Sequence, residues 1–262
     1  MIALIYDGSF DGLLCALARA LSRGDEVSLF ADGDGPADLF LQCERVITDV
    51  ARASRFSERF VDVAGEEELE TLLLVHASAD PRRHQFILGY ARSTRLARTG
   101  IGLRMGDPLV CAVQKAKGRV ILEIGKLLGF VRFSRAAPGF WYAPLAPEAN
   151  IVGFLGPHFA DRFPDEDFLI HDTRRDIGYR GARGVGGVVD LRGLPAAARR
   201  ALHQESEPDF ADQWQTYFRL IAVPERINPR LQTKNMPRRY WANLIEVPGV
   251  LNGEGMERKE GM

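Results

Sequence analysis

The side chains best suited to chemistry lie in two neighbouring segments, PHFADRF and IHDTRR. His158 and Arg162 are four residues apart, so they lie side by side if the first segment is a helix. Asp172 in the second segment could accept a hydrogen bond from either of them and fix its orientation, as a carboxylate does for a catalytic imidazole. His158, His171 and Asp172 are therefore candidate catalytic residues, with Arg162 and Arg174 orienting a phosphate-bearing substrate. Because no nucleophile accompanies them, a buried polar clamp between helix and sheet is an equal alternative.

The N-terminal stretch YDGSFDGLLCAL follows an apolar run and predicts a strand, a loop and a helix. A helix N-terminus can bind an anion, but Asp7 and Asp11 would oppose a phosphate, and neither the dinucleotide pattern nor the P-loop pattern is present. We expect Asp7 or Ser9 to cap the helix. The alternative is a site in the loop, formed by Tyr6, Asp7, Ser9 and Asp11, that binds a metal or a partner.

No set of metal ligands stands at a recognisable spacing. His171 and Asp172 are adjacent on a predicted strand and so point to opposite faces. Asp7, Asp11, His158 and Asp172 could meet only through tertiary folding. We therefore expect neither a metal nor a cofactor. His76, His84 and His203 stand alone and are expected to be structural or on the surface.

Charge is distributed unevenly, although the net charge is only −1. Residues 1–50 have a balance of −6, residues 81–140 a balance of +10, and residues 219–239 a balance of +5 with Tyr240 and Trp241 directly after them. Basic residues mixed with aromatic ones are typical of proteins that bind single-stranded or distorted nucleic acid. Taken alone, each block could also be a solvated face.

The length of 262 residues allows one large or two small domains. Hydrophobic content of 46% and charged content of 26% are ordinary for a globular protein, and no apolar stretch is long enough to span a membrane. The N-terminus has no basic leader with a cleavage site, so we expect a cytoplasmic protein. The three cysteines are far apart, which favours buried thiols over a zinc site or disulfides.

Hydrophobic periodicity predicts a mixed α+β protein. The predicted order is a small α/β element with strands at 2–6 and 26–31, then helices near 38–56, 66–77, 82–99 and 107–128, and then a unit of helix and antiparallel sheet. That unit contains a hairpin over 129–147, a helix that Pro157 kinks or breaks, a strand over 167–176 and a strand in GGVVDL. Helices over 208–223 and from Pro237 follow. The expected regions are 1–128, 129–246 and a disordered polar tail, 247–262, although the first two could form one compact body.

The predicted helix over 107–128 is the most regular. Asp107 is its expected cap and Gly129 its expected end. Three cations share the side opposite the apolar arc: Lys115, Arg119 and Lys126. Glu123 lies one turn after Arg119 and could pair with it.

Several motifs in order resemble one uncharacterised bacterial family of DNA metabolism proteins. They are YDGSFDGLLCA, E-x-x-K-x-x-GFVRF, YAPLAPEANIVGFLGPHFADRF, IHDTRR, W-x-x-YF, ERIN and K-x-MPRRYW, and they span residue 2 to about residue 246. Two positions depart from the family pattern: Gly125 replaces a histidine expected shortly after Glu123, and Pro157 precedes the HF pair. The resemblance implies a genomic association with a radical-SAM protein of DNA modification or repair. It also implies a relation to a domain fused to uracil-DNA glycosylase-like proteins.

The charge pattern and the resemblance together predict a protein that binds single-stranded or damaged DNA and acts with a radical-SAM partner. The alternatives are an enzyme that uses His158, His171 and Asp172, and a module that recruits the partner protein without touching DNA. The expected nucleic-acid-binding residues are Lys115, Arg119, Lys126, Arg132, Arg162, Arg174, Arg175, Arg226, Asn228, Lys234, Arg238, Arg239, Tyr240 and Trp241.

Overall fold

The computed structural model describes residues 2–23, 26–34, 42–97 and 100–195, together with residues 198, 202, 236, 237, 240 and 241. Its contacts divide the chain into two compact units, Met1–Leu122 and Glu123–Met262, and each is described by itself. The predicted helix over 208–223, the polar tail and most of the predicted helix from Pro237 lie outside the described residues. The mixed α+β class is confirmed.

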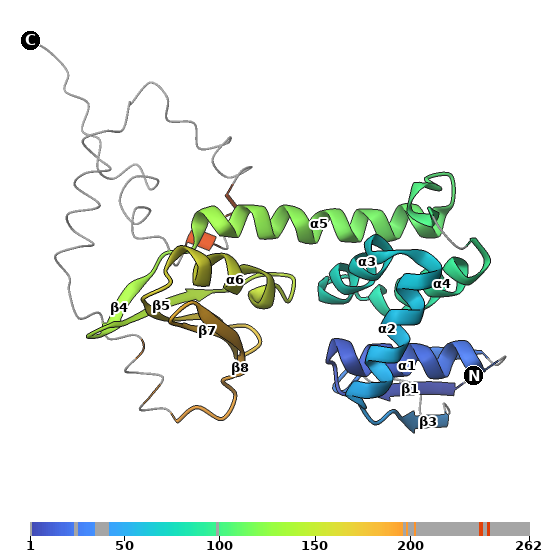
Figure 1. Ribbon diagram of the computed structural model, residues 1–262, viewed down its shortest axis with the longest axis horizontal. Coiled ribbons are helices and arrows are strands. Elements are labelled where there is room, and N and C mark those ends of the chain that lie inside the picture. Colours follow the sequence, from blue (N-terminus) through green and yellow to red (C-terminus); the bar gives the residue numbers. More distant parts are fainter. Residues whose placement is uncertain are drawn as a thin grey trace, which may run out of the picture. The chain divides into compact units, whose positions relative to one another are not determined.

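The first unit begins with the predicted strand, helix and strand: β1 (Ile2–Tyr6), α1 (Phe10–Ser22) and β2 (Val27–Ala31). The two strands pair in parallel, and β3 (Gln42–Arg45) adds to the other side of β1 (Figure 1). Of the two predicted caps, Asp7 and Ser9, it is Ser9 whose hydroxyl accepts a hydrogen bond from the Gly12 amide at 2.9 Å. Gly8 supports this turn with a φ of 84°, which a side chain would disfavour.

Helices complete the first unit: α2 (Val50–Ala64), α3 (Glu66–Ala77), α4 (Arg83–Ala97) and the start of α5 (Pro108–Phe130), with a short 3-10 helix, η1 (Ile101–Leu103), before α5. Helices α3, α4 and α5 match the predicted segments closely. The predicted helix over 38–56 is wrong in its first part, because residues 42–45 pair with β1 as a strand. That pairing partner is distant in sequence, so local periodicity did not reveal it.

Helix α5 begins as predicted. The Asp107 carboxylate accepts a hydrogen bond from the Leu109 amide at 2.8 Å. Val113 and Leu127 of the predicted apolar arc are buried. Ile121, from the same arc, is 48% exposed.

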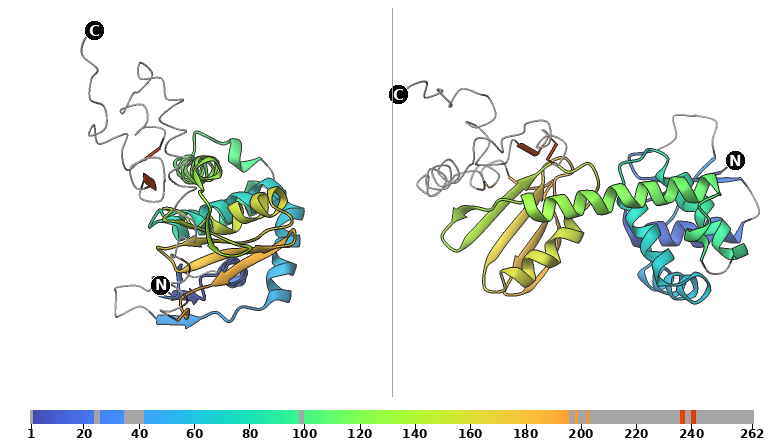
Figure 2. Two further views of the ribbon diagram at one scale, coloured as in Figure 1. Left: turned by 90° about the vertical axis from the view of Figure 1, so that its left-hand side faces the viewer. Right: turned by 90° about the horizontal axis from the view of Figure 1, so that it is seen from above.

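The second unit contains a five-stranded sheet in the order β4-β5-β6-β7-β8, with α6 (Val152–Arg162) on one face (Figures 1 and 2). The strands are β4 (Ser134–Ala137), β5 (Phe140–Leu145), β6 (Asp167–Asp172), β7 (Ile177–Ala182) and β8 (Val185–Asp190). The predicted hairpin is confirmed for β4 and β5, and Gly139 has the positive φ, 73°, that its turn needs.

Three predictions for this unit need correction. The sheet is not wholly antiparallel, because α6 forms a crossover that makes β5 and β6 parallel. Pro157 does not start a new helix, because α6 continues through it; Gly153, whose carbonyl loses its helical partner, is exposed, so water can reach it. Strand β6 ends at Asp172, so the residues after it belong to a turn and not to an alternating strand.

Close packing joins α6 to the sheet. A Cβ atom at Gly156 would lie 2.0 Å from the ring of Tyr179 on β7. The absence of a side chain there lets the helix approach the sheet closely, and Phe168 and Tyr179 fill the space between the two layers with rings 6.3 Å apart. This layer holds both ends of α6, and therefore the loops on either side of it, in place.

Among the helices within the described ranges, none combines the length and the apolar character that crossing a bilayer requires.

Candidate functional site

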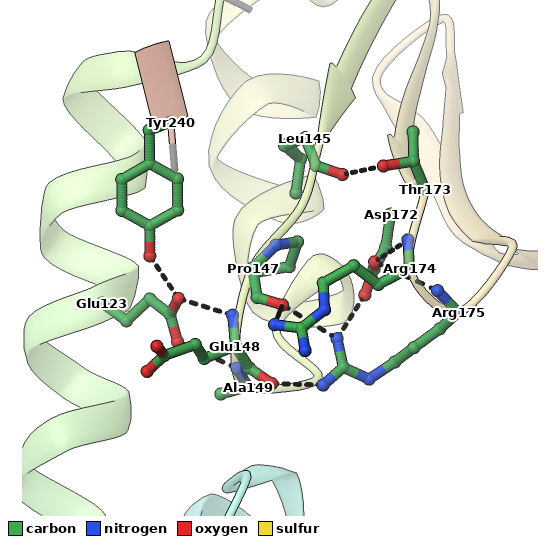
Figure 3. A network of polar contacts seen from close by, with 10 residues as sticks. All are labelled: Glu123, Leu145, Pro147, Glu148, Ala149, Asp172, Thr173, Arg174, Arg175 and Tyr240. Carbon is green, nitrogen blue, oxygen red and sulfur yellow. Dashed lines mark hydrogen bonds and ion pairs between the residues drawn. The ribbon is translucent and has the colours of Figure 1, made fainter. Parts of the chain in front are cut away.

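Glu123 is the centre of a buried polar network at the end of α5 (Figure 3). Its Oε1 accepts a hydrogen bond from the Glu148 amide at 2.8 Å and another from the Tyr240 hydroxyl, and its Oε2 accepts one from the Ala149 amide at 2.9 Å. The carboxylate thus satisfies two amides of the loop between β5 and α6, and it seats Tyr240, which is 4% exposed. Arg119, its expected partner, lies 3.8 Å from Asp80 instead.

The other side of the same loop is held by Asp172 and Arg175 (Figure 3). Arg175 donates to Asp172 at 2.7 Å, to the Pro147 carbonyl at 3.2 Å and to the Glu148 carbonyl. Asp172 is completely buried and also accepts from the amides of Arg174 and Arg175. The expectation that Asp172 would receive Arg162 or His158 is therefore wrong: the arginine three residues further along the chain folds back onto it across the turn.

This network lies at the carboxyl ends of the two parallel strands, β5 and β6. In an α/β arrangement loops at that edge are where ligands usually bind. Here Thr173 closes the edge further, donating from its hydroxyl to the Leu145 carbonyl at 3.1 Å. The donors and acceptors point at one another, so the arrangement fixes the shape of the β5–α6 loop and is a positioning device.

The three candidate catalytic residues do not share one cleft. His158 is exposed on α6, with its ring edge-on to Phe159. His171 is buried, and its ring nitrogens contact the Tyr142 hydroxyl at 2.8 Å and Asp176 at 3.3 Å. Asp172 belongs to the clamp described above. The hydrogen bonds of His171 and Asp172 give them structural partners within the sheet and its turns, and not the predicted clamp to helix α6.

Sequence reasoning missed a cluster in the first unit. The Tyr6 hydroxyl lies between two imidazoles, 2.8 Å from His84 Nε2 and 3.0 Å from His76 Nε2. Burial, reinforced by the charge of Arg83, lowers the pKa of each histidine to about 4, and burial also raises the pKa of Tyr6. At neutral pH both imidazoles are uncharged, so one donates to the hydroxyl and the other accepts from it. Three residues far apart in sequence meet here, which no local pattern reveals.

The loop after Tyr6 holds Ser9 in position to cap helix α1. Asp7 accepts hydrogen bonds from the amide and hydroxyl of Ser9 and from the hydroxyl of Thr48. Desolvation opposes ionisation of Asp7, but these hydrogen bonds outweigh it and lower its pKa. Asp11 is exposed in the first turn of α1. Within the described part of the chain, no group of three or more His, Cys, Asp or Glu residues is arranged to hold a metal ion.

The expected nucleic-acid-binding cations fall into three groups. Lys115 and Arg162 are exposed and Lys126 is half-buried, and none of the three has an acidic partner among the described residues. Arg119, Arg132, Arg174 and Arg175 contact Asp80 or backbone carbonyls, and Arg175 is committed to the buried network. Five further predicted residues lie outside the described ranges: Arg226, Asn228, Lys234, Arg238 and Arg239.

The aromatic pair after the last basic block is partly described. Tyr240 is buried against Glu123, as shown above, and the Trp241 indole donates to the Met236 carbonyl at 3.0 Å. Both rings were predicted to contact nucleic acid. Tyr240 is 4% exposed, so its ring has little surface on which a base could stack.

Comparison with known families adds one finding. A model described as "Domain of unknown function (DUF4130)" matches residues 81–246, well over half of the chain. The chain belongs to the DUF4130 family. The matched part of this DUF4130 protein contains α5, the Glu123 network and the sheet of the second unit. Neither the search of curated proteins nor the search of solved structures found a match.

Proposed function

We propose that this DUF4130 protein binds DNA, single-stranded or damaged, and acts in DNA metabolism together with a radical-SAM enzyme. The motif resemblance supports the radical-SAM partner, and the charge distribution supports DNA as the ligand. The observation that carries DNA binding is the burial of Glu123. It is the one acidic residue of α5, whose sequence also holds four cations. With that carboxylate withdrawn and hydrogen-bonded, the exposed charges of α5 are positive.

Pairing with acidic residues restricts which cations are available to bind DNA. Within the basic segment 81–140, Arg82, Arg83, Lys117 and Arg119 all have acidic partners in the first unit. Lys115 and Lys126 retain their charge for a ligand. Backbone phosphates are the expected ligands of such cations, since they supply most of the affinity of non-specific DNA binding.

The test is the affinity of the full chain for single-stranded and duplex oligonucleotides over a salt series, measured by fluorescence anisotropy. We expect binding at low salt, tighter for the single strand, that weakens steeply as salt rises. Failure to bind either oligonucleotide at low salt, with and without the radical-SAM protein, would refute the proposal. Copurification of the partner from nuclease-treated extract, in the absence of DNA binding, would favour the recruiting module instead.

A further inference from the structure

The second unit has an open aromatic pocket that the proposed DNA-binding role does not use. It has a volume of about 200 Å³ and is lined by Phe133, Trp141, Phe163, Phe168 and Glu166. Trp141 and Phe168 are register partners on the parallel strands β5 and β6, so their side chains leave the same face of the sheet. Phe133 meets Phe163 and Phe168 edge to face, with ring centroids 5.7 and 5.6 Å apart. Four rings therefore surround one small space.

A carboxylate stands at the exposed side of this pocket. The Trp141 indole donates to Glu166 Oε2 at 2.9 Å, which holds both groups in a fixed relation. A carboxylate accepts several hydrogen bonds, so this contact leaves most of its acceptor capacity for a ligand. Aromatic faces are electron-rich, and the negative charge of Glu166 adds to their field.

The chain segment at the rim of the pocket, which contributes Phe163 and Glu166 to the lining, is also mainly acidic. Residues 161–166 contain Asp161, Asp165 and Glu166 against the single cation Arg162. Asp161, Asp165 and Glu166 are exposed. Arg162 already lies over the Phe163 ring, with its guanidinium carbon 5.8 Å from the centroid. The rim would repel a phosphate group and attract a cation.

We infer that this pocket binds a methylated ammonium group, presented by a lysine side chain of a basic segment in a partner protein. Aromatic rings with a nearby carboxylate are the usual receptor for such cations, because the ring quadrupole attracts positive charge that is only weakly hydrated. The pocket is smaller than the roughly 300–1,000 Å³ of sites for larger organic ligands, which suits the head of one side chain. Glu166 lines the pocket, and Asp161 and Asp165 are exposed in the same short segment, so the local acidic charge exceeds that of one ammonium group and favours a basic peptide.

Calorimetric titration of the full chain can test this inference. The probe is a short peptide with one trimethyllysine between arginines, compared with the same peptide carrying the neutral tert-butyl isostere of trimethyllysine. We expect the charged peptide to bind at least about fivefold more tightly, because the two differ in charge and hardly in shape. Equal affinity for the two peptides, or no binding of either, would overturn the inference.

Two further probes distinguish the source of the ligand. Free tetramethylammonium should bind at the same site more weakly than the peptide, since it lacks contacts with the acidic rim. If instead it binds as tightly as the peptide, the site takes a small molecule and the partner-protein inference is wrong. A free deoxynucleotide that competes with the peptide would likewise overturn the inference, in favour of a nucleobase pocket.

Substitutions in the aromatic pocket test whether the peptide binds there. Trp141→Phe keeps a ring but removes the indole N–H that holds Glu166, and Glu166→Gln removes the charge; each should weaken peptide binding about threefold to tenfold. Glu70→Gln, at an exposed position of α3 in the first unit, is the matched control and should leave it unchanged. Circular dichroism verifies that each variant folds. Unchanged peptide affinity in both folded pocket variants would also contradict the inference.

Discussion

At the scale of single residues, Glu123 has the most consequential position in the second unit. It is a carboxylate on the stretch of α5 between Val120 and Leu127, both of which are buried, and Lys126 is the only other charged residue of that stretch. Buried carboxylates need hydrogen-bond donors, and this one receives them from two loop amides and a phenol. Glu123 lies three residues after one buried valine and four before a buried leucine, a spacing that puts all three on one side of a helix. That spacing is the sequence signal that could have indicated its burial.

Replacement of Glu123 should destabilise the protein strongly. Glu123→Ala leaves the amides of Glu148 and Ala149 without their acceptor, so we expect a loss of about 3 kcal/mol in the free energy of unfolding. Tyr240→Phe removes only one donor and should cost about 1 kcal/mol. Urea denaturation measures both, with Glu70→Gln as the surface control. A loss below about 1 kcal/mol for Glu123→Ala would contradict the role assigned to the carboxylate.

The Tyr6 cluster predicts how stability depends on pH. His76 and His84 have a pKa of about 4 in the folded protein against the ordinary 6.5, so the unfolded chain takes up protons first as pH falls. The contribution of the two histidines to stability should therefore be constant above pH 7 and decrease from about pH 6.5 to pH 4, by about 2–3 kcal/mol for each histidine.

The control for this prediction is the double variant His76→Asn/His84→Asn. It can be less stable than the wild type at neutral pH, so the measurement is the slope of the free energy of unfolding against pH. We expect the double variant to lose most of the slope between pH 6.5 and 4. If it retains the wild-type slope, these histidines do not titrate as inferred.

At the scale of elements, the close approach of α6 to the sheet depends on a missing side chain. Gly156→Ala would place a methyl group against the Tyr179 ring, which is itself enclosed by Phe168 and by Gly186 of β8. Overpacking of this kind typically costs about 1–3 kcal/mol. Thermal unfolding should show the loss as a lower melting temperature.

A second helical glycine provides the control. Gly125 of α5 has open space where a Cβ would lie, so Gly125→Ala should stabilise the helix by about 0.5–1 kcal/mol. The two substitutions are chemically identical and should have opposite signs. Stabilisation by both would mean that Tyr179 can move aside, and that the contact does not determine the position of α6.

At the scale of the whole molecule, pairing of charges decides which cations of the basic sequence are available to the DNA ligand that we propose. Lys126 has no acidic partner among the described residues, whereas Arg192 contacts both oxygens of Asp190 at 3.1 Å or less. If the proposed function holds, Lys126→Ala should reduce the slope of log affinity against log salt by about one phosphate contact. Arg192→Ala should leave the slope unchanged. Equal effects of the two variants would contradict the role proposed for Lys126 in DNA binding.

The sequence by itself determined the elements whose signals are local. The βαβ start with its Ser9 cap, the Asp107 cap of α5, the hairpin turn at Gly139 and the mixed α+β class all follow from capping chemistry, periodicity or turn residues within a few positions. Those interactions join neighbours in the chain, so a linear pattern contains them.

Only the tertiary structure decided the partners of the polar side chains. Asp172 binds Arg175 and not His158, Glu123 binds a loop and Tyr240 and not Arg119, and His76 and His84 meet at Tyr6. The sequence also did not reveal strand β3 or the parallel pairing of β5 with β6, because both depend on partners that are distant in the chain. Each of these contacts depends on which distant segments the packed core brings together, and a buried donor binds whichever acceptor the fold places beside it.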